Sequence, residues 1–178
     1  MTERKSYAPH RINWVDIETT GLDVEACPIL EVAHAITDSQ YRILCQNEWT
    51  VKHDPNKLML TRFAWETHQK LLARCFYESS FDLETISLNM IAAMEKHSAV
   101  GAPMGGNSIG GFDRPYFKRY LPEVEKKMHY RNFDTSTLLM FADSHGIKLD
   151  IGGPPPHRAM DDILASIEIA RKLKEAMR

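Results

Sequence analysis

The spacing of apolar residues changes near residue 60 of this chain, and this change limits the folds the chain can adopt. Before it, residues 11–18, 29–37 and 41–51 are rich in β-branched and aromatic side chains, which is typical of strands. After it, residues 61–78 and 82–97 carry apolar side chains at helical spacing. Strands followed by helices predict an α/β fold in which helices cover one sheet.

The second half of the chain alternates short strands with helices. Residues 99–104 and 129–134 read as short strands, and a glycine-rich loop follows the first of them at 105–111. Helices are expected from Asp113 to a break at Pro122, over residues 135–145 up to Gly146, and from about Ala159 to the end. We therefore expect a mixed sheet of about five strands flanked by helices. A short tail, residues 1–10, would precede a single domain over 11–178.

The overall charge restricts the kind of ligand that the chain can bind. The formal net charge is −2, with 26% charged residues, so the chain lacks the basic excess of proteins that grip long nucleic acids. Either it does not bind nucleic acid, or its substrate is short and held by local contacts and metal.

The cysteines and the hydropathy pattern bear on location. Cys27, Cys45 and Cys75 are widely spaced and odd in number, which argues against a disulfide framework or a zinc site. No run of 18 apolar residues occurs, and the polar residues 1–10 lack the apolar segment of a signal peptide. We expect a reducing compartment, the cytoplasm, or the mitochondrion if the source is eukaryotic.

The first candidate functional residues along the chain are two acidic side chains on one expected strand. Asp16 and Glu18 are two apart on an expected strand, so their carboxylates share one face. At about 4 Å and an effective dielectric constant of about 20, such a pair repels by roughly 4 kcal/mol. A divalent cation would remove that repulsion, since hard cations prefer carboxylate oxygens. The alternative is a solvated strand end.

Further acidic residues stand at expected helix starts. Asp113 follows the glycine-rich loop, and Asp134 ends a short strand before Thr135. Each could accept a cation or simply cap the helix that follows it.

Asp162 differs from its neighbour in the direction it faces. At about 100° per residue, Asp161 lies on the polar arc of the last helix, whereas Asp162 lies on the opposite side with Ser166 and Ile169. A buried carboxylate is costly without a partner. Arg158, one turn earlier, is the local cation that could satisfy it; otherwise a metal or a buried hydrogen-bond network must do so.

These acidic residues and His157 form an ordered set that resembles the DEDDh exonucleases, which have an RNase H-like fold. The set comprises D-x-E at residues 16–18, Asp113 after a loop, and H-x-x-x-x-D from His157 to Asp162. The similarity is closest to the oligoribonuclease family and spans roughly residues 11–172. It is carried by WVDIETTGLD (14–23), GNSI (106–109), HYRNFDTSTL (129–138) and HRAMDDI (157–163).

The resemblance implies a 3′→5′ exoribonuclease that degrades short single-stranded RNA, dinucleotides included, to 5′-monophosphates. Asp16, Glu18, Asp113 and Asp162 would hold two divalent ions, Mg²⁺ or Mn²⁺, and His157 would be the general base. The resemblance further implies a homodimer and no membrane partner. Asp134 is then a supporting residue.

The same resemblance suggests which residues contact the substrate. They are Leu22 as a wedge against a base, Tyr130 and Arg131 across a dimer interface, Ser108 and Ser136 near the terminal phosphate, and His68 and Trp65 as further contacts. Other interpretations stay open: Leu22 as a turn residue, Tyr130 as a core residue, and Ser136 as part of a helix start.

The chain departs from that family in three places. The loop from Ser108 to Asp113 is one residue longer, HQKLLA replaces the family's H-x-x-S-G-L at His68, and the segment before His157 is proline-rich. Two other functions therefore stay open. One is a broader DEDDh exonuclease on single-stranded DNA or longer RNA, and the other is an inactive module that binds nucleic acid.

Overall fold

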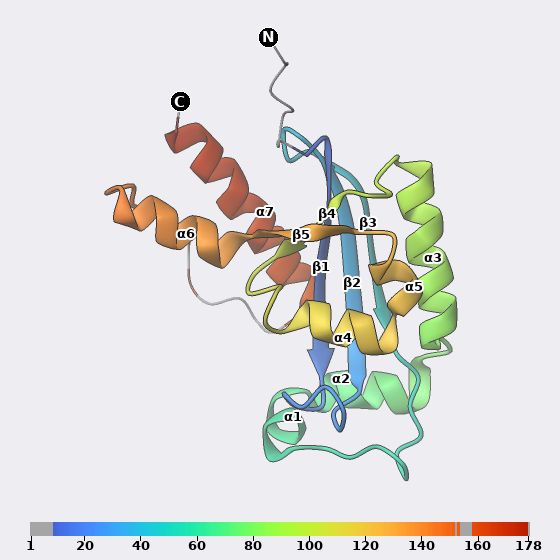
Figure 1. Ribbon diagram of the computed structural model, residues 1–178. Coiled ribbons are helices and arrows are strands. Elements are labelled where there is room, and N and C mark those ends of the chain that lie inside the picture. The colour runs from blue at the N-terminus through green and yellow to red at the C-terminus, as the bar shows by residue number, and fades with distance from the viewer. Residues whose placement is uncertain (1–8, 152, 154–157, 178) are drawn as a thin grey trace.

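A five-stranded sheet runs through the middle of the molecule, in a computed structural model that describes residues 9–151, 153 and 158–177 (Figure 1). The strands are β1 (Arg11–Thr19), β2 (Ile29–Asp38), β3 (Ile43–Thr50), β4 (Pro103–Gly106) and β5 (His129–Asp134). Their order is β3-β2-β1-β4-β5. The first three are antiparallel, whereas β4 runs parallel to β1 and β5 parallel to β4. The predicted mixed sheet is confirmed.

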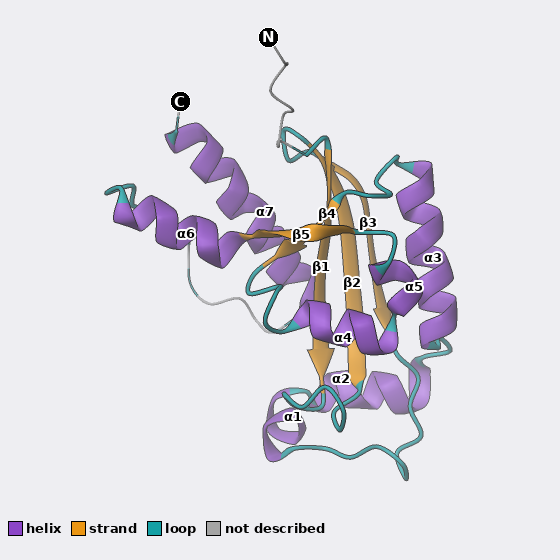
Figure 2. Ribbon diagram, viewed as in Figure 1, coloured by secondary structure: helices purple, strands orange, loops and turns teal. Residues whose placement is uncertain are grey.

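Helices flank this sheet on both sides (Figure 2). They are α1 (Arg62–Thr67), α2 (Gln69–Ala73), the π-helical turn η1 (Arg74–Glu78), α3 (Leu83–Lys96), α4 (Asp113–Tyr120), α5 (Pro122–Glu125), α6 (Thr135–Ser144) and α7 (Ala159–Ala176). The prediction of one helical segment over 61–78 missed a break at His68. That residue has φ −109° and ψ 25°, so it ends α1 and precedes α2.

Successive side chains of β1 enter different cores, because a strand points its residues alternately to its two faces. Val15 and Ile17 belong to the core that α3 and α4 cover. Ile12 and Trp14 belong to the core on the other face, with Ile163 of α7. Asp16 and Glu18 continue the second series, so the alternation directs both carboxylates toward the α7 side.

The pairing of β1 with β4 is short. It involves only Asn13 and Trp14 of β1, whereas β2 follows β1 over its whole length. Gly106 ends β4 with φ +153°, and a Cβ at this position would lie 2.8 Å from the carbonyl oxygen of Val15. Glycine alone permits this close approach. Beyond Trp14, no strand in the described part of the chain pairs with β1 on the β4 side, and α4 packs there.

None of the described helices is long and apolar enough to span a bilayer.

Candidate active site

Three carboxylates from two distant parts of the chain meet at one place. Asp16 and Glu18 of β1 and Asp162 of α7 each offer an oxygen, and these oxygens lie within 4.8 Å of one another. Asp161 is exposed, whereas Asp162 is half-buried. The prediction that the two neighbours face opposite ways is confirmed. Oxygen ligands of this kind suit a hard divalent cation.

Asp113 adds a fourth carboxylate from the opposite flank of β1. It is the first residue of α4 and only 2% exposed, while Phe112 occupies the cap position without a side-chain bond. The capping interpretation of Asp113 is therefore wrong. The backbone of Ile17 donates a hydrogen bond to its carboxylate, but Oδ1 has no partner. A buried oxygen without a donor is expensive unless a cation satisfies it.

Burial and mutual repulsion make the ionised forms of these groups costly. Burial raises the pKa of Asp16 well above its usual range, and the charges of Asp113 and Asp162 raise it further. Burial and the charge of Asp162 raise the pKa of Glu18 to about 7. Burial raises the pKa of Asp113 to about 8, although backbone hydrogen bonds oppose this. A positive ion among them would lower all these pKa values.

His68 is buried beside the acidic cluster. Its Nε2 is 3.4 Å from Oε2 of Glu18, and the residue is 5% exposed. The break between α1 and α2 places it there, at the end of the sheet where β1 ends (Figure 1). Trp65 of α1, in contrast, is 57% exposed.

Asp134 caps a helix and also holds a loop. Its Oδ1 accepts hydrogen bonds from the backbone N–H groups of Ser136 and Thr137 and from the Ser136 hydroxyl. The helix-start interpretations of Asp134 and Ser136 are therefore confirmed. The same oxygen accepts a bond from the N–H of Ser108, at 3.3 Å. Asp134 thus ties the loop after β4 to the start of α6.

Two of the expected substrate contacts are exposed to solvent. Leu22 is 83% exposed, in a loop whose Gly21 carbonyl accepts bonds from the Tyr116 and Thr19 hydroxyls. Tyr130 is 71% exposed, with the Arg131 guanidinium carbon 4.7 Å from its ring centroid. The interpretation of Tyr130 as a core residue is wrong.

Glu31 lies near the cluster, and the sequence pattern did not predict it. Glu31 of β2 is fully buried, and it bonds to Arg74, Arg158 and the N–H of Ala159. Glu31 is the one acidic residue of the predicted strand at 29–37, and this was the signal that could have revealed it. His157 lies outside the described residues.

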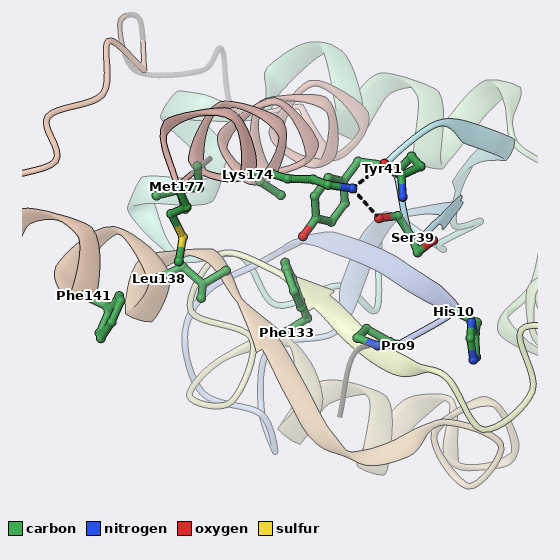
Figure 3. A pocket seen from close by; sticks show the side chains of 12 residues that line it. Pro9, His10, Ser39, Tyr41, Phe133, Leu138, Phe141, Lys174 and Met177 are labelled. Atoms are coloured by element: carbon green, nitrogen blue, oxygen red, sulfur yellow. Dashed lines mark hydrogen bonds between the residues drawn. The ribbon is translucent and has the colours of Figure 1, made fainter. Parts of the chain in front are cut away.

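An apolar hollow of about 740 Å³ lies away from these acidic residues. Figure 3 shows Tyr41, Phe133, Leu138, Phe141 and Met177 around it, with Lys174 bonded to the Ser39 carbonyl at 3.1 Å. None of the four clustered carboxylates lines the hollow. Its chemistry is that of a surface for apolar contacts.

The chain is similar to known nucleases over nearly its whole length. The exonuclease family RNase_T matches residues 13–170. The oligoribonuclease of Ectopseudomonas mendocina is 33% identical over 165 residues, which make up 89% of this chain and 91% of that protein. The oligoribonuclease of Neisseria meningitidis serogroup A is 36% identical over 168 residues, 91% and 89% of the two chains.

Solved structures of exonuclease I share the fold. The enzyme from Methylocaldum szegediense gives a TM-score of 0.66 at 17% identity, over 93% of this chain and 40% of that one. The E. coli enzyme in complex with a 5cy-dT13 oligonucleotide gives 0.62 at 13% identity, over 94% and 40%. The chain thus spans about 40% of these larger proteins. The likeness confirms the RNase H-like fold.

Proposed function

Since the chain belongs to the exonuclease family RNase_T and to its oligoribonuclease relatives, we propose that it degrades short oligoribonucleotides, dinucleotides included, from the 3′ end to 5′-monophosphates. It is a nuclease that hydrolyses phosphodiester bonds, and short single-stranded RNA is the proposed substrate. The net charge of −2 supports a short substrate, because a long one would be held largely through a basic surface.

The convergence of three carboxylates at the end of β1, with the buried Asp113 close enough to repel Asp16 and Glu18, carries this proposal. The three offer oxygens within 4.8 Å of one another, and the buried Oδ1 of Asp113 has no hydrogen-bond partner. Such a donor set fits hard divalent cations, which exonucleases of this fold use. We propose that Asp16, Glu18, Asp113 and Asp162 hold two such ions, Mg²⁺ or Mn²⁺. When bound, the ions would acidify the attacking water and stabilise charge on the leaving oxygen.

The protein's own groups supply the remaining parts of the reaction. We propose that His157 takes the proton from the attacking water, because a histidine with an ordinary pKa of about 6.5 accepts a proton at neutral pH. It precedes Arg158, the N-cap residue of α7, and is five positions from Asp162 in the sequence.

Residues around the cluster would hold the substrate. The exposed Leu22 is proposed to pack against a base, and Ser108 with Ser136 to lie near the terminal phosphate. His68 contacts Glu18, so its proposed role shifts from substrate contact to support of that carboxylate. Trp65, on the exposed face of α1, is a further candidate for base stacking.

We further propose that the protein is a homodimer. Met140 and Phe141 of α6 are 74% and 52% exposed, and Phe141 lines the apolar hollow in Figure 3. A second copy would cover these apolar side chains and bring Tyr130 and Arg131 to a neighbouring site. Light scattering on the purified protein gives the mass directly, and a fully active monomer would refute this assembly.

A reducing compartment, the cytoplasm, is the proposed location. Cys27, Cys45 and Cys75 are all free, and two of them are buried. This is the state that cysteines keep in such compartments.

Activity on 5′-labelled RNAs of two to twenty nucleotides, in Mg²⁺ and in Mn²⁺, tests the proposed substrate. We expect turnover to fall steeply with length. Equal turnover of two-mers and twenty-mers would favour a broader exonuclease, and a matched single-stranded DNA series would show whether that enzyme accepts deoxyribose.

A further inference from the structure

Glu31 is a fully buried carboxylate next to the acidic cluster, and it is not one of the three residues whose oxygens converge there. It is paired with Glu18 in the register of β1 and β2, so the two side chains leave the sheet on the same face. A buried acid beside other acids needs compensating partners.

Those partners come from two separate elements. Arg158 donates through Nη2 to Oε1 at 3.3 Å and through Nε to Oε2 at 3.4 Å, and the N–H of Ala159 donates to Oε2 at 3.3 Å. Arg74 of η1 donates to Oε1 at 3.2 Å. Arg158 also reaches Glu48 of β3, at 3.1 Å. Glu31 of β2 and Glu48 of β3 thus both bond to Arg158, the N-cap residue of α7.

These bonds hold a residue that lies one helical turn before Asp162. The N–H of Asp162 donates to the carbonyl of Arg158 at 3.1 Å, so the two residues are joined by the first turn of an 18-residue helix. Arg158 provides no side-chain cap of its own, and Glu31 instead accepts the N–H of Ala159. Fixing this end of the helix fixes where Asp162, in its first turn, lies relative to β1.

We propose that Glu31 is a positioning residue, which sets through Arg158 and the start of α7 the place where Asp162 meets Asp16 and Glu18. It thereby sets the affinity of the cluster for divalent cations. This inference rests on the proposed metal-dependent function.

The two arginines offer a matched comparison. Both bond to Oε1 of Glu31 and are exposed to similar extents, 41% for Arg158 and 35% for Arg74. Arg158 leads into the helix that carries Asp162, whereas η1 carries none of the four carboxylates. By Coulomb's law alone, removing either positive charge would tighten the binding of a cation. Arg158 also lowers the pKa of Glu18, so weaker binding in its variant indicates lost positioning where it persists at a pH above that pKa and Arg74→Gln binds as the wild type does.

The experiment measures Mn²⁺ affinity by calorimetry for the wild type, Arg158→Gln, Arg74→Gln and Glu31→Gln, together with urea unfolding of the metal-free proteins. Partners behind metal ligands typically contribute about 10- to 100-fold in affinity, so we expect Arg158→Gln to weaken Mn²⁺ binding at least about 10-fold. Arg74→Gln should keep the wild-type affinity or tighten it. Saturating Mn²⁺ should restore much of the kcat that Arg158→Gln loses.

Two results would overturn the inference while the wild type still binds Mn²⁺. One is unchanged or tighter binding by Arg158→Gln. The other is an equal weakening by both arginine variants in proportion to their lost stability. A wild type that binds no Mn²⁺ would refute the proposed function and this inference together. If Glu31→Gln does not fold, the arginine pair decides alone.

Discussion

Glu18 and Glu31 lie opposite each other on β1 and β2, and different partners hold their carboxylates: His68 contacts the first, and Arg74 and Arg158 bond the second. Two neighbouring acids are thus separated into one that offers an oxygen to the cluster and one that holds the surrounding structure. The difference arises because the junction of α1 and α2 places His68 beside Glu18, whereas η1 and the start of α7 place Arg74 and Arg158 beside Glu31.

Replacing His68 with Gln should weaken Mn²⁺ binding about 10-fold, because Glu18 loses a buried neighbour that orients its carboxylate. Calorimetry on the variant measures the change, with Gln69→Ala, at the exposed first residue of α2, as the control. Wild-type Mn²⁺ affinity together with a raised KM for RNA would instead return His68 to the role of substrate contact.

Asp162→Asn should lower kcat by about 10³-fold, and Asp161→Asn should change it little. Metal-ion catalysis is worth several kcal/mol, and each 1.36 kcal/mol corresponds to tenfold in rate. The metal-free Asp162→Asn protein should be as stable as the wild type or more so, because Asp162 repels Asp16 and Glu18. Turnover of a labelled dinucleotide and thermal melting measure the two effects. Equal losses in both variants would contradict the facing of α7.

Adding Mn²⁺ at about 100 times its Kd should stabilise the folded protein by about 2.7 kcal/mol. For a chain of this size, that corresponds to a rise in Tm of about 5–10 °C. Differential scanning fluorimetry measures it, with EDTA restoring the metal-free value. Asp113→Asn should lose most of the rise, since its buried Oδ1 has no hydrogen-bond partner and its charge acts on Asp16. A wild type with no rise would favour an inactive module.

His34 should make the protein less stable in mild acid. It is fully buried in β2, 3.2 Å from the Asn13 side chain, and burial lowers its pKa to about 4. The unfolded chain binds a proton at about pH 6.5 and the folded chain only near pH 4. Stability is therefore lost as the pH falls through this window, by about 2 kcal/mol at pH 5.

The difference between the wild type and His34→Gln in urea unfolding at pH 7 and pH 5 isolates this loss, because the raised pKa values of Glu18 and Asp113 stabilise the metal-free fold as the pH falls. The variant should lack that part of the pH dependence. The exposed His145→Gln serves as the control and should behave as the wild type does. The same slope in all three proteins would show that other groups cause it.

Asp134→Ala should destabilise the fold by about 1 kcal/mol, the usual cost of losing a helix cap. Its carboxylate also accepts the Ser108 N–H, so the loop after β4 should loosen and KM should rise. Denaturant titration and steady-state kinetics report the two effects separately. Asp143→Ala, exposed in the same helix, is the matched control.

Local pattern predicted most elements because it depends on side chains close in sequence. The rotation of α7 followed from its periodicity, so the inward direction of Asp162 could be predicted. The break at His68 could not, because it depends on tertiary contacts: Leu71 and Leu72 of α2 pack on Leu30 of β2, and His68 contacts Glu18. Glu31 was missed because its partners, Arg74 and Arg158, lie 43 and 127 positions away in the sequence. Only the fold brings them together.

The early separation of β1 from β4 has a consequence for how such a nuclease could be silenced. The strands pair only at Asn13 and Trp14, and the Ile17 backbone is thereby left to bond Asp113. If β4 paired with β1 for two more residues, its backbone would occupy the place beside Ile17 where the Asp113 carboxylate now lies. Such a lengthening of β4 would keep every acidic residue in the sequence, but it would displace Asp113 and abolish the activity.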